Sequence, residues 1–310
     1  MTLSEGIRKD IQINTVNPTI FHRLFFEILQ ARKVLPGDFV LRFGNLPPLF
    51  KLKGRVVVFL QNRYLIDPVS LHKLPFKSRV RLLIERLWLS CRLKNVDEFL
   101  VQTPTMKKYL ELKTFGKIPI RVLPFVDNAF GFPPDPHDCC AGLDCLYDFI
   151  YVASGEPHKN HQNLLEAWSL LGKEGIFPSL CLTIDVGNFT PLCSHIASLC
   201  DKENLIINNA GSLDHKEVLA LYKKSKALIY PSKFESFGIP LIEAKQAGLP
   251  VLAPELDYVR DILDPVEVFD PNSSVSIARA VKRFIGLERA SLTMLDAAQF
   301  LALMRSGDSL

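Results

Sequence analysis

The sequence predicts an α/β protein with two doubly wound, parallel-sheet domains. The chain has 310 residues, which is long for one compact domain and comfortable for two. Short β-rich apolar runs alternate with segments of helical periodicity in both halves. A stretch rich in Pro and Gly, residues 127–144, separates the halves. We therefore expect an N-terminal domain over residues 1–140, a C-terminal domain over residues 147–290 and a tail over residues 291–310.

The alternation is clearest in the C-terminal half. Asp214 and Glu217 form a capping box at the start of one helix, and Pro240 and Gly248 suit the first turn and the C-cap of another. Strands are expected over residues 149–153, 180–186, 205–207, 227–230, 251–252 and 266–269. Helices are expected over residues 164–171, 218–222, 240–247 and 276–284.

The N-terminal half alternates less regularly, but the same two patterns occur in it. Strands are expected over residues 11–15, 39–42, 55–60, 99–102 and 120–123. Helices are expected over residues 21–32, 78–93 and 105–112.

The composition is that of a globular protein. Apolar residues make up 48% of the chain and charged residues 23%, so a buried core is expected. The formal net charge of +4 suits an anionic small molecule, an anionic membrane surface or weak contact with nucleic acid. Because no basic block with interleaved aromatic residues occurs, nucleic acid is not an expected partner.

The cysteines and the apolar runs indicate a compartment. Seven cysteines without a C-x-x-C pair argue against a zinc ribbon or a disulfide framework, and favour reduced thiols in a cytosolic protein. The N-terminus lacks the apolar stretch of a signal peptide, and no run of about 18 apolar residues occurs. A cytoplasmic location is therefore expected.

The segment YPSKFESFGIPLIEAKQAGLPV, residues 230–251, is the most informative in the chain. It predicts a strand, a loop that carries Glu235 and a helix that carries Glu243 near its start. Both carboxylates then lie at the carboxyl edge of the sheet, where open α/β sheets bind ligands. The helix N-terminus suits a diphosphate, and Gly238 allows close approach of the backbone. The two carboxylates can accept hydrogen bonds from sugar or ribose hydroxyls.

This pattern resembles the E-x7-E signature of the GT4 family of retaining glycosyltransferases, and the resemblance extends over residues 149–284. It implies the GT-B fold, in which two Rossmann-like domains face a central cleft. It also implies that Glu235 contacts the transferred sugar and that Glu243 binds the ribose of the nucleotide. The intervening residues would present backbone amides to the sugar or the phosphates: Ser236, Phe237, Gly238 and Ile239. An unrelated loop carboxylate and helix carboxylate are the alternative.

A second motif, SGEPHKNHQN at residues 154–163, also follows a strand and precedes a helix. The family usually carries a lysine here, which implies that Lys159 pairs with the diphosphate and acts in catalysis with Glu235. The Arg that often lies upstream is absent, and His158 is the nearby substitute. A solvated loop lysine is the alternative. Gly187 and Gly211 would border the nucleotide base, or serve only as turn glycines.

The N-terminal half resembles the family weakly. It has no Gly-rich loop near its start, which indicates an incomplete domain on the acceptor side, and Gln61 and Asn62 stand where many relatives carry a His at a strand end. The helix over residues 78–94 is apolar on one side with basic flanks. It is interpreted as a core helix with a solvated basic face, and peripheral attachment to an anionic membrane is the alternative.

With this resemblance, the leading hypothesis is transfer of a hexose, with retention, from a nucleotide-diphosphate sugar to a saccharide or lipid-linked saccharide. The resemblance implies a UDP- or GDP-sugar donor, no metal and no other cofactor, and a role in cell-surface polysaccharide or lipopolysaccharide synthesis. A degenerate relative that binds nucleotide or sugar without turnover is the main alternative. A sugar-nucleotide epimerase or a phosphorylase on the same fold is a third.

Overall fold

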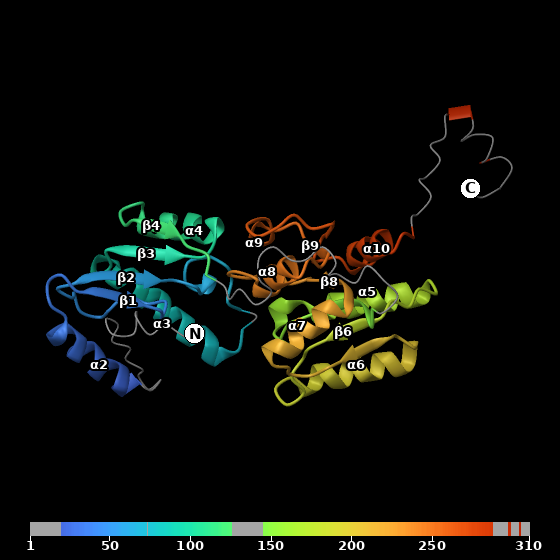
Figure 1. Cartoon of the computed structure of the whole chain (residues 1–310), viewed down its shortest axis with the longest axis horizontal. Helices are drawn as coiled ribbons and strands as arrows, with labels where there is room; N and C mark the ends of the chain where they lie inside the picture. Colours follow the sequence, from blue (N-terminus) through green and yellow to red (C-terminus); the bar gives the residue numbers. More distant parts are fainter. Residues whose placement is uncertain (1–19, 73, 126–144, 288–296, 299–303, 305–310) are drawn as a thin grey trace.

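The computed structural model describes residues 20–72, 74–125 and 145–287, together with residues 297, 298 and 304. The described residues form two α/β units that lie side by side, each around its own parallel sheet (Figure 1). This arrangement confirms the predicted fold class. The predicted linker, the first predicted strand at residues 11–15 and most of the tail lie outside the described residues, so the exact domain limits stay a prediction.

The N-terminal unit has a four-stranded parallel sheet in the order β1-β2-β3-β4. Each of its strands and helices coincides with a predicted element to within two residues. The strands are β1 (Phe39–Arg42), β2 (Arg55–Phe59), β3 (Glu98–Val101) and β4 (Ile120–Val122); the helices are α2 (Ile20–Lys33), α3 (Phe76–Arg92) and α4 (Pro104–Thr114), with 3-10 turns η1 (Arg63–Leu65) and η2 (Leu93–Asn95).

The C-terminal unit has a six-stranded parallel sheet in the order β10-β9-β8-β5-β6-β7. Its strands are β5 (Tyr147–Tyr151), β6 (Leu180–Leu182), β7 (Ile207–Asn209), β8 (Ser225–Ile229), β9 (Val251–Pro254) and β10 (Glu267–Phe269). The chain runs outward from β5 to β7 and then returns to the other side of β5 at β8. The crevice between the carboxyl ends of β5 and β8 is therefore the switch point of the sheet, where such folds bind ligands.

The helices of this unit are η3 (Pro157–Lys159), α5 (His161–Lys173), α6 (Thr190–Glu203), α7 (His215–Lys223), α8 (Ile239–Gln246), α9 (Asp257–Arg260) and α10 (Ser274–Phe284). The predicted capping box of Asp214 and Glu217 starts α7. The sequence pattern did not predict α6, which buries only Ile196 fully and so has a thin apolar stripe. It did not predict α9 because four residues are too few to show a period.

Each unit has a separate hydrophobic core. In the C-terminal core, Trp168 packs edge-on against Phe149 with ring centroids 5.6 Å apart, and its indole N–H donates to the Pro178 carbonyl oxygen at 2.9 Å. In the N-terminal core, Leu60, Leu89 and Phe99 are fully buried. Two cores in one chain mean that the surfaces between the units can form a cleft without opening either core.

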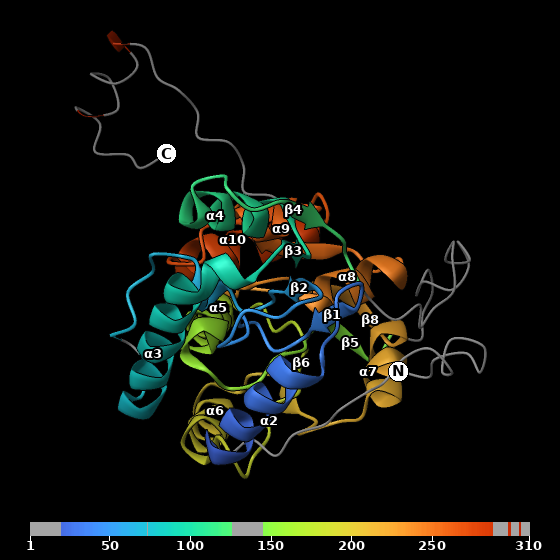
Figure 2. The same cartoon turned by 90° about the vertical axis from the view of Figure 1, so that its left-hand side faces the viewer.

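Helix α3 differs from its predicted interpretation. The helix lies along one outer side of the N-terminal unit (Figure 2). Only Leu82 and Leu89 are buried, and α3 carries an apolar stripe that is exposed to solvent. The stripe consists of Phe76, Val80, Leu83, Ile84 and Leu87. The interpretation as a core helix with a solvated basic face is therefore confirmed for Leu82 and Leu89, but it does not account for this stripe. None of the helices among the described residues is long and apolar enough to cross a membrane.

Candidate functional site

A cavity of about 750 Å³ opens between the two units at the carboxyl ends of the C-terminal strands. The C-terminal unit supplies most of its wall, from the end of β8, the loop that follows it and α8. The N-terminal unit supplies Gln61, Gln102 and Phe125. The Gln61 side-chain amide donates to that of Gln102 at 3.4 Å, and Gln102 donates to the Phe125 carbonyl oxygen at 3.2 Å. The N-terminal wall is therefore uncharged and rich in hydrogen-bonding groups.

Glu235 lies in the loop between β8 and α8, and one of its carboxylate oxygens is held by three donors. Its Oε1 accepts from Lys159 Nζ at 2.7 Å, Ser232 Oγ at 2.6 Å and Tyr230 OH at 2.9 Å. The Glu235 and Lys159 side chains are only 12% and 16% exposed. Among the described residues no donor reaches Oε2. The carboxylate is thus fixed in orientation and keeps one oxygen for a ligand.

Buried tyrosines hold the backbone around this ion pair. Tyr151 OH donates to the Lys159 carbonyl oxygen at 2.6 Å, and Tyr258 OH donates to the Ser232 carbonyl oxygen at 2.7 Å. Burial raises the pKa values of Tyr151, Tyr230 and Tyr258 well above the ordinary value for tyrosine, and the negative charge of Glu235 is the second cause. The three phenols therefore stay protonated and act as hydrogen-bond donors.

Lys159 is positioned by the turn that joins β5 to α5. It ends η3, and the next residue, Asn160, has a left-handed backbone with φ of 63°. The buried Asn160 amide donates to the carbonyl oxygens of Pro231 and Pro271 at 3.1 and 2.7 Å. Since Pro231 lies two residues after the end of β8, Asn160 ties the β5 turn to the loop of Glu235.

Glu243 lies in α8 and has its own supports. Its Oε2 accepts from Tyr222 OH at 3.0 Å, and its Oε1 lies 3.3 Å from His215 Nδ1. Burial and the neighbouring carboxylate raise the pKa of Tyr222 well above its ordinary value. Tyr222 is therefore a permanent donor to Glu243, whereas His215 is half exposed and lies on the cavity wall.

The start of α8 faces the same cavity. Gly238 precedes the helix with φ of +67°, and a Cβ there would lie 3.1 Å from Leu241 Cδ1. A left-handed backbone in close contact favours glycine. The first turn of α8 contains Pro240 and no acidic side chain. Its free N–H groups and partial positive charge therefore favour an anion.

A second cavity of about 600 Å³ lies at the opposite edge of the C-terminal sheet. Its charged groups, Asp148 and Lys226, stand near the starts of β5 and β8 and pair with each other at 2.7 Å. Ligand chemistry is concentrated at the carboxyl edge instead.

Comparison with known proteins agrees with this geometry. Residues 146–299 match the family model described as glycosyl transferases group 1. The C-terminal half of the chain belongs to this family. The serotype-specific mannosyltransferase WbdA of Escherichia coli is 32% identical over 162 residues, which are 51% of this chain and 19% of WbdA. The chain thus spans about a fifth of the length of that relative.

Two solved structures share the architecture. One is a trehalose-6-phosphate synthase studied for glycosyl transfer with retention, with a TM-score of 0.60 and 14% identity over 91% of this chain and 74% of that one. The other is Anabaena Alr3699/HepE in complex with UDP and glucose, with a TM-score of 0.53 and 13% identity over 76% of this chain and 63% of that one. At these identities the likeness shows the GT-B fold alone.

The glycosyl transferase domain brings most of the predicted site residues together. Lys159, Glu235 and Glu243 line the cavity, and so does the loop of Ser236, Phe237, Gly238 and Ile239. Gly187 and Gly211 follow β6 and β7 at the same edge but do not line the cavity. His158 does not line it either. Its carbonyl oxygen accepts from Lys233 N at 2.8 Å, and burial followed by the charge of Lys159 lowers its pKa. The ligand contacts predicted for all these residues stay predictions.

Several residues of the site were not predicted from the sequence. They are Tyr151, Tyr222, Tyr230, Ser232, Tyr258, Gln102 and Phe125. In the sequence, the tyrosines look like ordinary core residues of strands and helices. Gln102 and Phe125 lie in the N-terminal unit, far in sequence from the motif around Glu235. Gln246 was also missed. It is 4% exposed, lines the cavity one turn after Glu243, and its Nε2 has no partner among the described residues. A buried amide without a partner lowers stability.

We predict that His161, the first residue of α5, makes the domain sensitive to acid. Its Nε2 donates to the Ser154 carbonyl oxygen at 2.8 Å, and burial lowers its pKa from 6.5 to about 4. Between pH 6.5 and pH 4, His161 is protonated in the unfolded chain but not in the folded chain. The free energy of unfolding therefore decreases as pH falls through this range. Chemical unfolding should show a loss of about 2 kcal/mol between pH 7.5 and pH 5 from this residue.

The matched variant is His161→Gln, whose amide can donate to Ser154 without titrating. Its free energy of unfolding should be lower at pH 7.5 but should fall less steeply towards pH 5 than that of the wild type. Equal slopes in the two proteins would contradict the assignment to His161.

Proposed function

We propose that the protein is a retaining hexosyltransferase that uses a nucleotide-diphosphate sugar and needs no metal. The observation that carries the proposal is the convergence of Lys159, Glu235, Glu243 and the α8 N-terminus on one cavity within a glycosyl transferase domain. Together these groups match the diphosphate, the ribose and the hexose of such a donor, and all four are on the C-terminal unit.

In the proposed complex, the diphosphate lies between Lys159 and the first turn of α8. Both carry positive charge, and both stabilise the charge that develops on the leaving nucleoside diphosphate. Glu243, held by Tyr222, accepts hydrogen bonds from the ribose hydroxyls. Glu235 Oε2 accepts from a hydroxyl of the transferred hexose, while Oε1 stays with its three donors.

In the proposed complex, Lys159 would serve two anions, the Glu235 carboxylate and the diphosphate. Lys159 is neutralised by Glu235 at 2.7 Å, so the carboxylate and an arriving phosphate compete for one ammonium group. An ammonium group has three donors, so it can bridge the two anions when both are present. Binding of the diphosphate would then link the orientation of Glu235 to the occupancy of the phosphate site.

Retention would follow if the acceptor hydroxyl attacks from the face that the diphosphate leaves. The trehalose-6-phosphate synthase was studied for glycosyl transfer with retention, and it supports this proposal only through the shared fold. No residue of the cavity is assigned as a general base. The Gln61–Gln102 wall lies opposite the donor groups and is proposed to meet the acceptor.

We further propose mannose as the hexose and a cell-surface polysaccharide or lipopolysaccharide precursor, free or lipid-linked, as the acceptor. The similarity to the mannosyltransferase WbdA supports this choice. GDP-mannose is accordingly the first donor to test, with UDP-glucose as the comparison.

The two carboxylates should separate chemistry from nucleotide binding. Glu235→Gln should lower kcat for donor turnover at least about 100-fold, the size of effect seen when one transition-state contact is lost, with a small change in nucleotide affinity. Glu243→Gln should instead weaken GDP or UDP binding about tenfold, since a ribose contact is lost. Release of nucleoside diphosphate and titration calorimetry measure the two effects.

Glu255→Gln, an exposed surface variant, is the matched control and should behave like the wild type. A wild type that binds neither nucleotide nor nucleotide sugar would rule out the proposal. Binding of nucleotide without turnover, with saccharide and lipid-linked acceptors supplied, would favour the degenerate binding protein.

We also propose that the protein attaches peripherally to the inner, anionic face of a membrane through α3. Its exposed stripe repeats at helical spacing, and exposed Lys77 and Arg81 lie beside it. An apolar stripe with basic flanks suits the headgroup region of such a bilayer. The protein would then be a cytoplasmic enzyme positioned near a lipid-linked acceptor.

Vesicle flotation tests this attachment. The wild type should bind vesicles with anionic phospholipid more tightly than zwitterionic ones, and the double variant Leu83→Gln, Leu87→Gln should bind at least about tenfold more weakly, because each side chain contributes about 1.5–3 kcal/mol of apolar burial. Ile206→Gln changes an equally exposed side chain in the C-terminal unit and is the control. Equal binding by all three proteins would contradict the proposal.

A further inference from the structure

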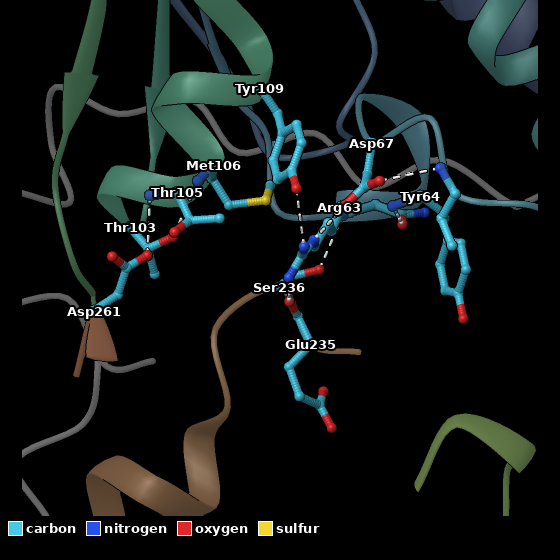
Figure 3. Close-up of polar contacts among 12 residues, drawn as sticks. Arg63, Tyr64, Asp67, Thr103, Thr105, Met106, Tyr109, Glu235, Ser236 and Asp261 are labelled. Atoms are coloured by element: carbon cyan, nitrogen blue, oxygen red, sulfur yellow. Dashed lines mark hydrogen bonds and ion pairs between the residues drawn. The ribbon is translucent and has the colours of Figure 1, made fainter. Parts of the chain in front are cut away.

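Arg63 is a residue of the N-terminal unit that contacts the loop carrying Glu235 (Figure 3). Its backbone N–H donates to Ser236 Oγ at 2.9 Å, and its guanidinium donates through NH1 to the Glu235 carbonyl oxygen at 3.2 Å. Arg63 therefore binds two consecutive residues of the loop between β8 and α8, residues 230–238, from across the cleft. We call this segment the donor loop.

The Arg63 guanidinium is enclosed rather than free in solvent. Its side chain is 11% exposed, and Nε donates to Asp67 Oδ2 at 2.8 Å. The carbon centre of the guanidinium lies 4.6 Å from the Phe234 ring centroid and 5.2 Å from that of Tyr109. Contact with ring faces and an ion pair with Asp67 fix the plane of the group, as cation–π geometry favours.

The turn that carries Arg63 is itself held firmly. Asn45 Oδ1 accepts from the backbone N–H groups of Gln61 and Asn62 at 2.6 and 3.0 Å. Arg86 of α3 donates to the Tyr64 carbonyl oxygen at 2.7 Å and to that of Asp67 at 2.9 Å. The backbone around Arg63 is therefore fixed to the N-terminal unit. The position of that unit determines where Arg63 contacts the loop.

Further contacts keep the units in this arrangement. The rings of Tyr64 and Phe234 lie 4.4 Å apart. At the N-terminus of α4, the Thr105 N–H donates to Asp261 Oδ2 at 2.9 Å, so a carboxylate of the C-terminal unit caps a helix of the N-terminal unit (Figure 3). These contacts flank Arg63 but do not touch Glu235 or Ser236.

We propose that Arg63 is a positioning residue that orders the donor loop for transfer only when the N-terminal unit is docked. This inference rests on the proposed function for its effect on turnover. The groups proposed to bind the nucleotide, Lys159, Glu243 and the start of α8, are all on the C-terminal unit. Loss of Arg63 therefore disturbs the presentation of the hexose and leaves nucleotide binding intact.

Kinetics with the full-length protein test this role. Arg63→Ala should lower kcat about 10- to 100-fold, with the KM for donor and the Kd for GDP or UDP within about twofold of wild type. Arg63→Lys should restore little, because an ammonium group cannot bind Asp67, the Glu235 carbonyl and the two rings in one plane. Arg283→Ala, which removes an arginine of α10 that pairs with Glu267, is the control and should match the wild type.

Hydrogen exchange gives a readout that does not depend on turnover. Amides of residues 234–238 should exchange at least about tenfold faster in Arg63→Ala than in wild type and Arg283→Ala, while amides of β8 stay unchanged. If the wild type shows no turnover but this exchange difference is found, the proposed function fails and the positioning role stands. If exchange and kcat are unchanged in a folded Arg63→Ala or Arg63→Gln variant, the positioning role is refuted.

Discussion

The ion pair between Lys159 and Glu235 is the interaction on which the site depends. It joins the turns after β5 and β8, the two strands at the switch point of the sheet. A partly buried ion pair gains little stability by itself, because desolvation offsets the attraction. Here two buried tyrosines donate to the pair, Tyr151 to the Lys159 carbonyl oxygen and Tyr230 to the Glu235 carboxylate. Tyr258 holds the backbone of Ser232, whose hydroxyl is a further donor to Glu235. The arrangement therefore fixes a charge pattern for a ligand, at some expense of stability.

The two units contribute different kinds of side chain to the cleft. The charged groups and the open helix N-terminus come from the C-terminal unit, whereas Gln61 and Gln102 form a neutral wall on the other side. A donor that carries a diphosphate needs charge, and a polyhydroxyl acceptor needs hydrogen bonds without strong charge. The observed division fits the proposed donor and acceptor.

Local pattern was sufficient to predict much of this molecule. Both sheets, the capping box of α7 and the strand-loop-helix around Glu235 follow from periodicity and from Gly and Pro placement. The resemblance to a known signature then placed Lys159 and Glu243 in the same site. Helices α9 and α6 were not predicted, because the hydrophobic periodicity of the sequence is weak in both. The exposure of the α3 stripe also escaped, since a periodic apolar face has the same pattern whether or not another element covers it.

What sequence could not reveal is contact between distant segments. Arg63 and Glu235 are 172 positions apart, and the family resemblance singles out the neighbouring Gln61 and Asn62 but not the arginine itself. Its partner is a backbone carbonyl oxygen, which every residue has and no residue type indicates. The same holds for Tyr258, which reaches the Ser232 carbonyl oxygen. A motif identifies the groups that meet a ligand, because those are chosen for their chemistry. The groups that hold the motif in place are chosen for their position, and position exists only once the chain is folded.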